Sequence, residues 1–376
     1  MLTMPILMIF YSQHGLTAHQ SFLLKSCYSL SIVVFEIPSG IAADLWGRKR
    51  TLVAGSILGT VGFVIYSLFS SFYAFMAAEF TLGLGMSFIS GADSAMIYDT
   101  LQAHGRQAEY AKYEGRNFSV GNFAEAAAGF VGGALAALNL LYPFYAQTLI
   151  AFTAVPAALT LVEPPRAICT SGKHRNMLAT LRFALIDNSA LRWNILYSSV
   201  LGCVTLSMAW VYPLRLSELG FDELHIGTIH TVLNLLLGVV TLFAYRIEQT
   251  LRPKNTVRLS TVTLTIAFVL AGLADRTGFL FVMLMFYLCR GIATPVLKDY
   301  VNRMTSSDIR ATVLSLRSLI IRACFVVVAP LFGYAADIWS LRKAFVILGI
   351  VFIVVTAAGI SLFLNALEKM PTYDEK

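Results

Sequence analysis

Long apolar runs separated by short polar connections fill almost the whole chain. A helix that crosses a bilayer needs about 20 predominantly apolar residues. Eleven runs meet this length and predict eleven membrane-spanning helices, at residues 20–43, 51–71, 73–100, 117–138, 140–162, 191–214, 224–248, 256–275, 277–302, 310–336 and 342–366. The runs are continuous, whereas the strands of a membrane barrel would alternate apolar and polar positions. The pattern therefore predicts an all-α integral membrane protein.

A shorter apolar segment, MLTMPILMIFY at residues 1–11, precedes these runs. At about 1.5 Å per residue it would cover only half of a bilayer core. It has no basic region and no A-x-A cleavage site, which disfavours a cleaved signal peptide. We interpret it as the second half of a twelfth helix whose beginning is missing, through a start codon assigned too late or a truncated chain.

One polar connection, residues 163–190, is longer than the others. The halves on either side of it match weakly at a constant offset, as Asp99 does with Asp299 and Gly133 with Gly333. Such a match is typical of transporters built from two parallel repeats. We predict four parts: a six-helix bundle at 1–162, a cytoplasmic central loop at 163–190, a second six-helix bundle at 191–366 and a cytoplasmic tail at 367–376.

Composition supports this class and orients the chain. Hydrophobic residues make up 57% of the chain and charged residues 13%, against about 25% charged residues in a soluble domain. The net charge is +7, and most Lys and Arg residues fall on one side of the membrane when loops alternate sides. The positive-inside rule places this side, together with the C-terminus, in the cytoplasm. We predict a multi-pass protein of a bacterial inner membrane.

Several other classes of function are disfavoured. The basic residues are not spread as in a nucleic-acid-binding protein, and the five cysteines suggest no disulfide framework and no metal cluster. No G-x-x-x-x-G-K-[ST] loop occurs, so the energy for transport would come from an ion gradient rather than from ATP. We expect a monomer that is not an enzyme and needs no cofactor. Its expected partners are a small solute, protons and the lipid bilayer.

The loop after the first long run reads GIAADLWGRKR, residues 40–50. Gly40 would permit close helix approach, and Gly47 a tight turn. Asp44 could face the positive end of a helix dipole, while Arg48 needs an acidic partner, for which Asp99 is our candidate. We predict that these five residues gate the cytoplasmic side, and the alternative is that the basic residues of the loop only set the topology.

The spacing of these glycines, aspartate and arginine resembles the loop between helices 2 and 3 of the major facilitator superfamily. The sequence departs from the family at Leu45, where a basic residue is usual, and in its short first helix. The resemblance covers essentially the whole chain in helix number and loop length. It implies twelve helices in two six-helix bundles and transport by alternating access.

A second resemblance lies in the helix predicted at 117–138, which contains GNFAEAAAGFVGG at residues 121–133. It is similar to the glycine-rich helix-5 signature of proton-coupled drug antiporters in the superfamily, although Ala128-Gly129 stands in place of Gly-Pro. The alternative is ordinary packing of small residues between helices.

Charged residues inside predicted helices are costly unless they face a cavity or a partner. The candidates are Lys25, Glu36, Glu79, Asp93, Glu125, Arg290, Lys298, Arg317 and Arg322. We expect Lys25 to extend toward the outer surface, although Glu79 could pair with it. Arg317 is expected near the cytoplasmic gate.

The charged residues farthest from the ends of the predicted helices are our candidates for proton coupling and substrate binding. Burial and a nearby arginine change the proton affinity of a carboxylate, so Glu125 is our proton-coupling candidate and Asp93 the second. Arg290 and Arg322 are predicted to bind substrate, and a static Glu125–Arg322 ion pair is the alternative. Further candidate lining residues are Asn122, Trp210, Tyr212 and Asn234, of which the two aromatic ones could instead be interface anchors.

We therefore predict a secondary active transporter that works by alternating access and exports a small amphipathic drug or metabolite in exchange for protons. Arg290 and Arg322 favour an alternative, the uptake or export of an anionic metabolite or siderophore. A transport-inactive receptor or scaffold is an alternative of another class, which the shortened first helix would suit.

Overall fold

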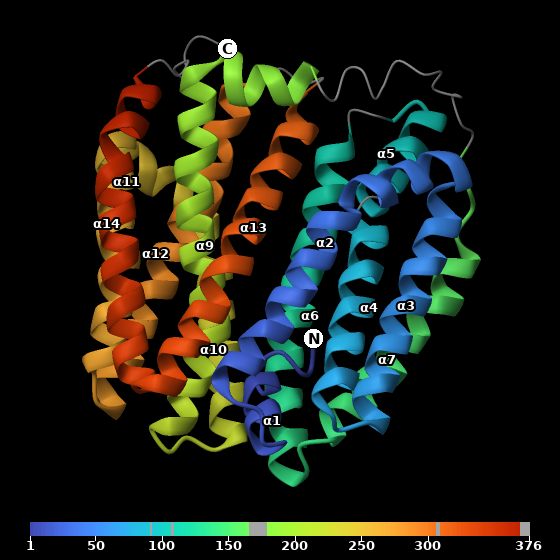
Figure 1. Ribbon diagram of the computed structural model, residues 1–376. Coiled ribbons are helices and arrows are strands. Elements are labelled where there is room, and N and C mark those ends of the chain that lie inside the picture. The colour runs from blue at the N-terminus through green and yellow to red at the C-terminus, as the bar shows by residue number, and fades with distance from the viewer. Residues whose placement is uncertain (91, 107–108, 165–178, 306–308, 369–376) are drawn as a thin grey trace. The chain divides into compact units, whose positions relative to one another are not determined.

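The computed structural model describes residues 1–90, 92–106, 109–164, 179–305 and 309–368. The described residues are mostly helical and include no strand (Figure 1). Half of the predicted central loop at 163–190 and most of the predicted tail at 367–376 lie outside them. The predicted all-α class is confirmed.

Along the chain, some helices precede this central segment and the others follow it. Those before it are α1 (Leu7–Gln13), α2 (Ala18–Trp46), α3 (Arg48–Leu68), α4 (Phe72–Ser90), α5 (Asp93–Ala103), α6 (Tyr110–Leu138) and α7 (Tyr142–Thr160). Those after it are the short π-helix η2 (Phe183–Asp187), α9 (Ser189–Glu218), α10 (Glu223–Leu251), α11 (Pro253–Leu273), α12 (Arg276–Arg303), α13 (Arg310–Ile338) and α14 (Leu341–Leu367).

Within the described residues, 10 helical segments are long and apolar enough to cross a membrane. They coincide with ten of the eleven predicted spans. The remaining one, predicted at 140–162, is α7, whose 19 residues include tyrosine, glutamine and proline that lower its mean hydropathy. The span predicted at 73–100 consists of two helices, α4 and α5.

The helix predicted over residues 1–11 is confined to α1, and residues 2–6 form turns. The residue before a proline disfavours the helical conformation, and Pro5 also lacks an N–H donor. The helix therefore begins only after Pro5.

The described helices belong to two compact units. The first unit comprises Met1–Ile168, Pro213–Val232 and Ala329–Gly333, and the second comprises Cys169–Tyr212, Leu233–Val328 and Tyr334–Lys376.

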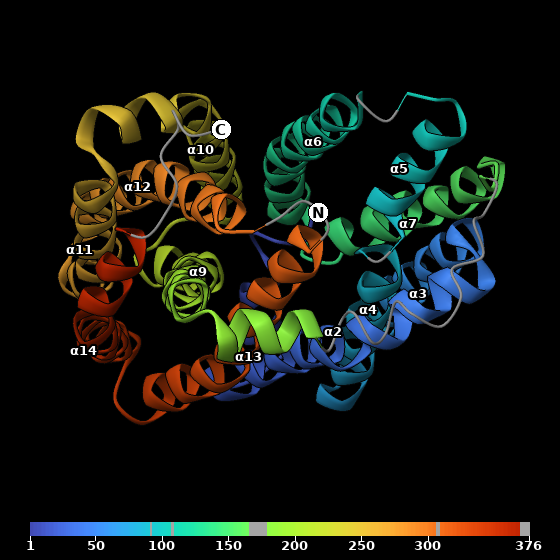
Figure 2. The same cartoon turned by 90° about the horizontal axis from the view of Figure 1, so that it is seen from above.

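Glycines allow close packing in the first unit, where α3 packs against α4 and α7, and α2 packs against α4 (Figure 2). A Cβ atom added to Gly55 of α3 would lie 2.9 Å from the carbonyl oxygen of Gly85 of α4. A Cβ atom added to Gly83 of α4 would lie 2.6 Å from the carbonyl oxygen of Tyr28 of α2. Small residues let membrane helices approach at the backbone, so α4 is held tightly between two neighbours.

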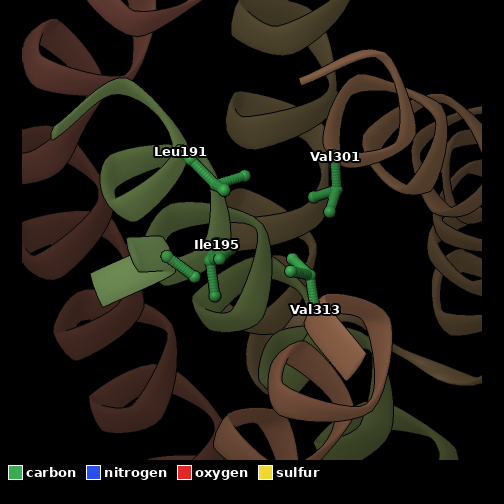
Figure 3. Close-up of a cluster of buried hydrophobic side chains, with 5 residues drawn as sticks. Leu191, Ile195, Val301 and Val313 are labelled. Atoms are coloured by element: carbon green, nitrogen blue, oxygen red, sulfur yellow. The ribbon is translucent and has the colours of Figure 1, made fainter. Parts of the chain in front are cut away.

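In the second unit α11 packs against α12 and α14 (Figure 2). Close to the start of α9, a buried apolar cluster joins this helix to α12 and α13 (Figure 3). Its labelled members are Leu191 and Ile195 of α9, Val301 of α12 and Val313 of α13. The cluster holds together the three helices that supply most of the candidate binding residues described below.

Candidate functional site

The loop between α2 and α3 is a single-residue turn at Gly47. Its backbone has φ 109° and ψ 155°, a conformation that residues with a Cβ atom rarely adopt. Because α2 ends at Trp46 and α3 begins at Arg48, this one glycine joins the two helices. This is the tight turn predicted for Gly47.

Arg48 contacts both aspartates of the predicted gating group. Its Nη2 lies 2.9 Å from Oδ1 of Asp44 on α2, and its Nε lies 3.2 Å from Oδ2 of Asp99 on α5. The Arg48 side chain is only 15% exposed, so these carboxylates replace most of its water. The structure thus places Arg48 against its predicted partner, while the gating role stays a prediction.

Glu163 also belongs to this group, and our sequence analysis missed it. Its two carboxylate oxygens accept hydrogen bonds of 2.8 Å each from the backbone N–H groups of Arg48 and Lys49. A carboxylate at the start of α3 satisfies free N–H groups and favours the positive end of the helix dipole. The signal was an acidic residue directly after the last apolar run of the first half.

The close helix approach predicted at Gly40 is wrong for this structure. Apart from the nearby backbone of α2 and the two chain neighbours, no described atom lies within 4 Å of a Cβ atom built on Gly40. The face of α2 that packs against α4 is instead marked by Ser39, which is buried and donates to the carbonyl oxygen of Ser87 at 2.8 Å. Gly40 points elsewhere because successive helical residues are about 100° apart.

A buried ion pair joins α2 to α4. Lys25 Nζ lies 2.8 Å from Oε1 and 2.9 Å from Oε2 of Glu79, and the two side chains are 5% and 1% exposed. The pairing predicted for these residues is confirmed. The expectation that Lys25 extends to the outer surface is wrong, because a buried ammonium is stabilised by the carboxylate within its reach.

Two tyrosines complete this group, which we call the Lys25–Glu79 cluster: Tyr11, Lys25, Tyr66 and Glu79. The hydroxyls of Tyr11 on α1 and Tyr66 on α3 donate to Glu79 Oε1 at 2.7 and 2.6 Å. The two hydroxyls also contact each other. Neither tyrosine is more than 1% exposed, so the cluster lies in a water-poor interior.

The predicted proton-coupling acids lie elsewhere in the first unit. Glu125 on α6 is 32% exposed at its side chain and forms an ion pair of 2.5 Å with the amino group of Met1. Asp93 is the first residue of α5, and its Oδ1 accepts a 2.6 Å hydrogen bond from the backbone N–H of Ser94. Their roles in proton coupling stay predictions.

The glycine-rich segment of α6 packs against the part of α10 that belongs to the same unit. A Cβ atom added to Gly129 would lie 2.8 Å from the His230 ring, and one added to Gly133 would lie 2.8 Å from Cα of Gly227. The hydroxyl of Thr231 donates to the carbonyl oxygen of Ala126 at 2.8 Å. Small-residue packing, the alternative reading of this segment, is therefore present.

A cavity of about 200 Å³ lies within the second unit, lined by α9, α11, α12 and α13. Arg290, Arg317 and Arg322 line it, and we call these three residues the arginine group. No aspartate or glutamate is among the lining residues. Within the described part of this unit, none of the three arginines forms an ion pair with a carboxylate.

Neutral partners orient two of these arginines. The guanidinium of Arg290 lies 5.3 Å from the ring centre of Tyr287. Arg317 donates from Nε to Oγ of Ser198 at 2.9 Å and from Nη2 to the carbonyl oxygen of Ser198 at 3.3 Å. Arg317, which we expected at the cytoplasmic gate, thus lines the same cavity as the two predicted substrate-binding arginines.

The other predicted lining residues do not line this cavity. Tyr212 is fully buried and packs edge-on against Tyr287 at 6.0 Å between ring centres. Trp210 and Asn234 are partly buried on α9 and α10, and Asn122 is exposed on α6. A role in substrate binding stays a prediction for these residues.

Comparison with known proteins identifies the family. The profile of the Major Facilitator Superfamily matches residues 1–286 and 206–374. The chain belongs to the Major Facilitator Superfamily. It is therefore a multi-pass membrane protein of a transporter family, and the resemblance seen at the α2–α3 loop is confirmed.

Relatives within the superfamily match only part of the chain. A stretch of 171 residues is 24% identical to the quinolone resistance protein NorA of Staphylococcus aureus, and it spans 46% of this chain and 43% of NorA. A stretch of 142 residues is 25% identical to an MFS-type transporter of Methanocaldococcus jannaschii, covering 38% of this chain and 36% of that protein. The match thus covers less than half the length of each relative.

Solved transporter structures share the superfamily fold over nearly the full chain. The nucleoside transporter NupG matches with a TM-score of 0.80 and 15% identity, over 96% of this chain and 95% of NupG. A bacterial homolog of the human lysosomal transporter Spinster matches with a TM-score of 0.76 and 15% identity, over 99% of this chain and 95% of that homolog. At these identities the likeness shows the fold alone.

Proposed function

We propose that this superfamily member is a secondary active transporter that moves a small organic anion across a bacterial inner membrane, by alternating access and in exchange for protons. The arginine group would bind the anionic part of the solute. Arg48, with Asp44 and Asp99, would close the cytoplasmic side, where the C-terminus would also lie.

The observation that carries this proposal is the arginine group itself. A cation within a membrane costs several kcal/mol unless a counter-charge or water compensates it. Three arginines share one cavity whose lining holds no carboxylate. A bound anion would supply the missing counter-charge, so the cavity favours an anionic solute over a cationic or neutral one.

The residues that line the cavity indicate which chemical groups the anionic solute has. Guanidinium groups present paired N–H donors that match carboxylate and phosphate oxygens. The hydroxyls of Thr294 and Ser318 are available as further donors, while Leu201 and Leu206 provide apolar contact. This lining suits a carboxylate or phosphate group attached to an apolar body.

A second candidate is the export of amphipathic drugs irrespective of their charge, our first prediction from the sequence. It is supported by the partial similarity to NorA and by the packing of the glycine-rich segment of α6. A quinolone carries a carboxylate on an aromatic ring system, so such a compound would fit both candidates. Compounds without an anionic group separate them.

The test is transport by the purified full chain in proteoliposomes with an imposed pH gradient. We expect norfloxacin to accumulate, whereas its decarboxylated analogue and the cationic dye ethidium do not. Arg322→Gln should abolish norfloxacin accumulation, and Lys298→Gln, which removes a cation outside the cavity, should not. Accumulation of ethidium together with unchanged norfloxacin transport by Arg322→Gln would favour the second candidate. No transport of any probe would favour a receptor or scaffold.

A further inference from the structure

The Lys25–Glu79 cluster is the most completely buried ion pair in the described part of the chain, since both side chains are at most 5% exposed. Breaking a membrane-buried charge pair is costly, and a well-packed apolar pair of similar size would often be as stable. Packing alone therefore does not account for charges at this position. We propose that Glu79 is the residue that takes up and releases the coupling proton, in place of Glu125 or Asp93.

The number of protons in the cluster supports this assignment. Three oxygen atoms are in mutual contact: the hydroxyls of Tyr11 and Tyr66, and Oε1 of Glu79. Each hydroxyl carries one proton, so two protons serve three oxygen–oxygen contacts while Glu79 is ionised. A third proton, on the carboxylate, would give every contact a donor. The cluster therefore has a place for one more proton.

Uptake of that proton changes the charge balance. The proton comes from water on one side of the membrane, binds the Glu79 carboxylate to give a carboxylic acid, and later leaves to water on the other side. While it is bound, the cluster passes from neutral to a net charge of +1, because Lys25 loses its counter-ion. A conformation in which Lys25 reaches water or an anion is then favoured, which links protonation to conformational change.

Groups on every packed element surround the cluster. Tyr11 comes from α1. His14 lies just after that helix, and its ring packs against Phe75 at 5.6 Å between ring centres. From α2 come Lys25, Cys27 and Tyr28, whose ring centre lies 4.9 Å from Lys25 Nζ. Tyr66 comes from α3, and α7 contributes Phe144, which packs against Tyr66 and carries no charge. Among the described groups that face it, Glu79 is thus the carboxylate available to the proton.

The proposal rests on the proton-driven transport proposed above, but it has a test that needs no substrate. Infrared difference spectra of the full chain in lipid nanodiscs, recorded between high and low pH, report the C=O stretch of a protonated carboxyl group. We expect a band that shifts in heavy water and is lost in Glu79→Gln. Glu36→Gln, which changes another intramembrane acid of the same unit, should keep the band.

Further variants cover the case in which Glu79→Gln does not fold. Glu79→Asp and Tyr66→Phe retain a carboxyl group at the site but change its hydrogen bonds, so each should shift the frequency of the band. A band that is unchanged in these variants, a band that survives Glu79→Gln, or no band in the unmodified protein would overturn the proposal. If the band is lost in Glu125→Gln instead, the coupling proton would be assigned to Glu125.

A transport assay then tests whether proton binding at Glu79 drives the accumulation of the solute. Glu79→Gln should still exchange external for internal norfloxacin but should not accumulate it against its gradient when a pH gradient is imposed. If the infrared band is assigned to Glu79 while the unmodified protein transports nothing, the proton site stands and the proposed function fails. If Glu79→Gln accumulates norfloxacin normally, the coupling role of Glu79 is wrong.

Discussion

Lys25 and Glu79 in the first unit neutralise each other, whereas Arg290, Arg317 and Arg322 in the second unit line a cavity that offers them no carboxylate. Both groups are intramembrane charges of the kind that lipid makes costly. In the first group each charge has its counter-charge inside the protein, so a change in the protonation of one residue leaves the other unbalanced. In the second group the counter-charge has to come from outside. Internal pairing of charges therefore suits a switch, whereas charges without an internal partner suit a binding site.

The largest effect is expected when the internal pair is broken on one side only. Lys25→Met leaves the Glu79 carboxylate buried without its cation, and we expect the free energy of unfolding to fall by about 3–5 kcal/mol. The measurement is thermal unfolding in detergent, followed by the loss of monodisperse protein in size-exclusion chromatography. The double variant Lys25→Met/Glu79→Met should recover most of the loss. Equal losses in the single and double variants would mean that the two charges do not compensate each other.

The arginine group should respond in the opposite way. Arg322→Gln removes a cation that has no carboxylate partner in the described part of its unit, so stability should be unchanged or slightly increased. Anion affinity should fall by roughly tenfold to a hundredfold, because a hydrogen bond to a charged group contributes about 1.5–3 kcal/mol. Titration of norfloxacin binding by its intrinsic fluorescence measures this effect. A large loss of stability would show that Arg322 has a structural anion of its own.

A smaller effect is expected at the α2–α3 loop, where the pair is partly exposed. Asp44 is 43% exposed at its side chain, so its contact with Arg48 contributes about 1 kcal/mol or less. Asp44→Asn should increase the labelling rate of cysteine probes on the cytoplasmic side by less than about tenfold. Leu45→Asn, at an exposed neighbouring position, is the matched control. Equal labelling of both variants and the unmodified chain would leave the loop as a topology signal only.

The smallest effect concerns pH at the start of α10. Hydrogen bonds from the backbone N–H of His225 and from its ring lower the pKa of Asp222 below its usual range. A lowered pKa contributes stability that is present above the ordinary pKa of aspartate and is lost as the pH falls through the lowered value. Asp222→Asn can still cap the helix but does not titrate. Between pH 7 and about pH 3, its unfolding temperature should therefore fall slightly less than that of the unmodified chain.

The outline of the fold could be predicted because lipid requires long apolar helices, and their length and continuity can be read from the sequence. The pattern of the loop also predicted the turn at Gly47. Asp99 could be named as the partner of Arg48 because its predicted helix ends at the same surface as the loop. The pairing of Lys25 with Glu79 was predicted, but its burial was not. Both residues are near the ends of predicted spans, where a lysine commonly reaches water.

The remaining features depend on contacts between distant segments. Tyr11 and Tyr66 have no local pattern that connects them with Glu79, and they meet only because α1, α3 and α4 converge. Arg317 was assigned to the gate from its depth alone, although α13 turns it toward the same cavity as Arg290. Which face of an apolar helix points inward is weakly encoded when both faces are hydrophobic.

If the arginine group binds anions, simple anions should stabilise the purified chain. Phenylphosphate and benzoate, each compared with its uncharged counterpart phenol or benzamide, are titrated while the unfolding temperature is followed. We predict that at least one anion, and neither uncharged compound, raises the unfolding temperature of the unmodified chain and of Lys25→Met/Glu79→Met, because a ligand stabilises the state that binds it. The same anion should leave Arg290→Gln/Arg322→Gln unaffected. An equal rise in the arginine variant, or a rise with phenol or benzamide, would show that the arginine group is not a binding site for anions.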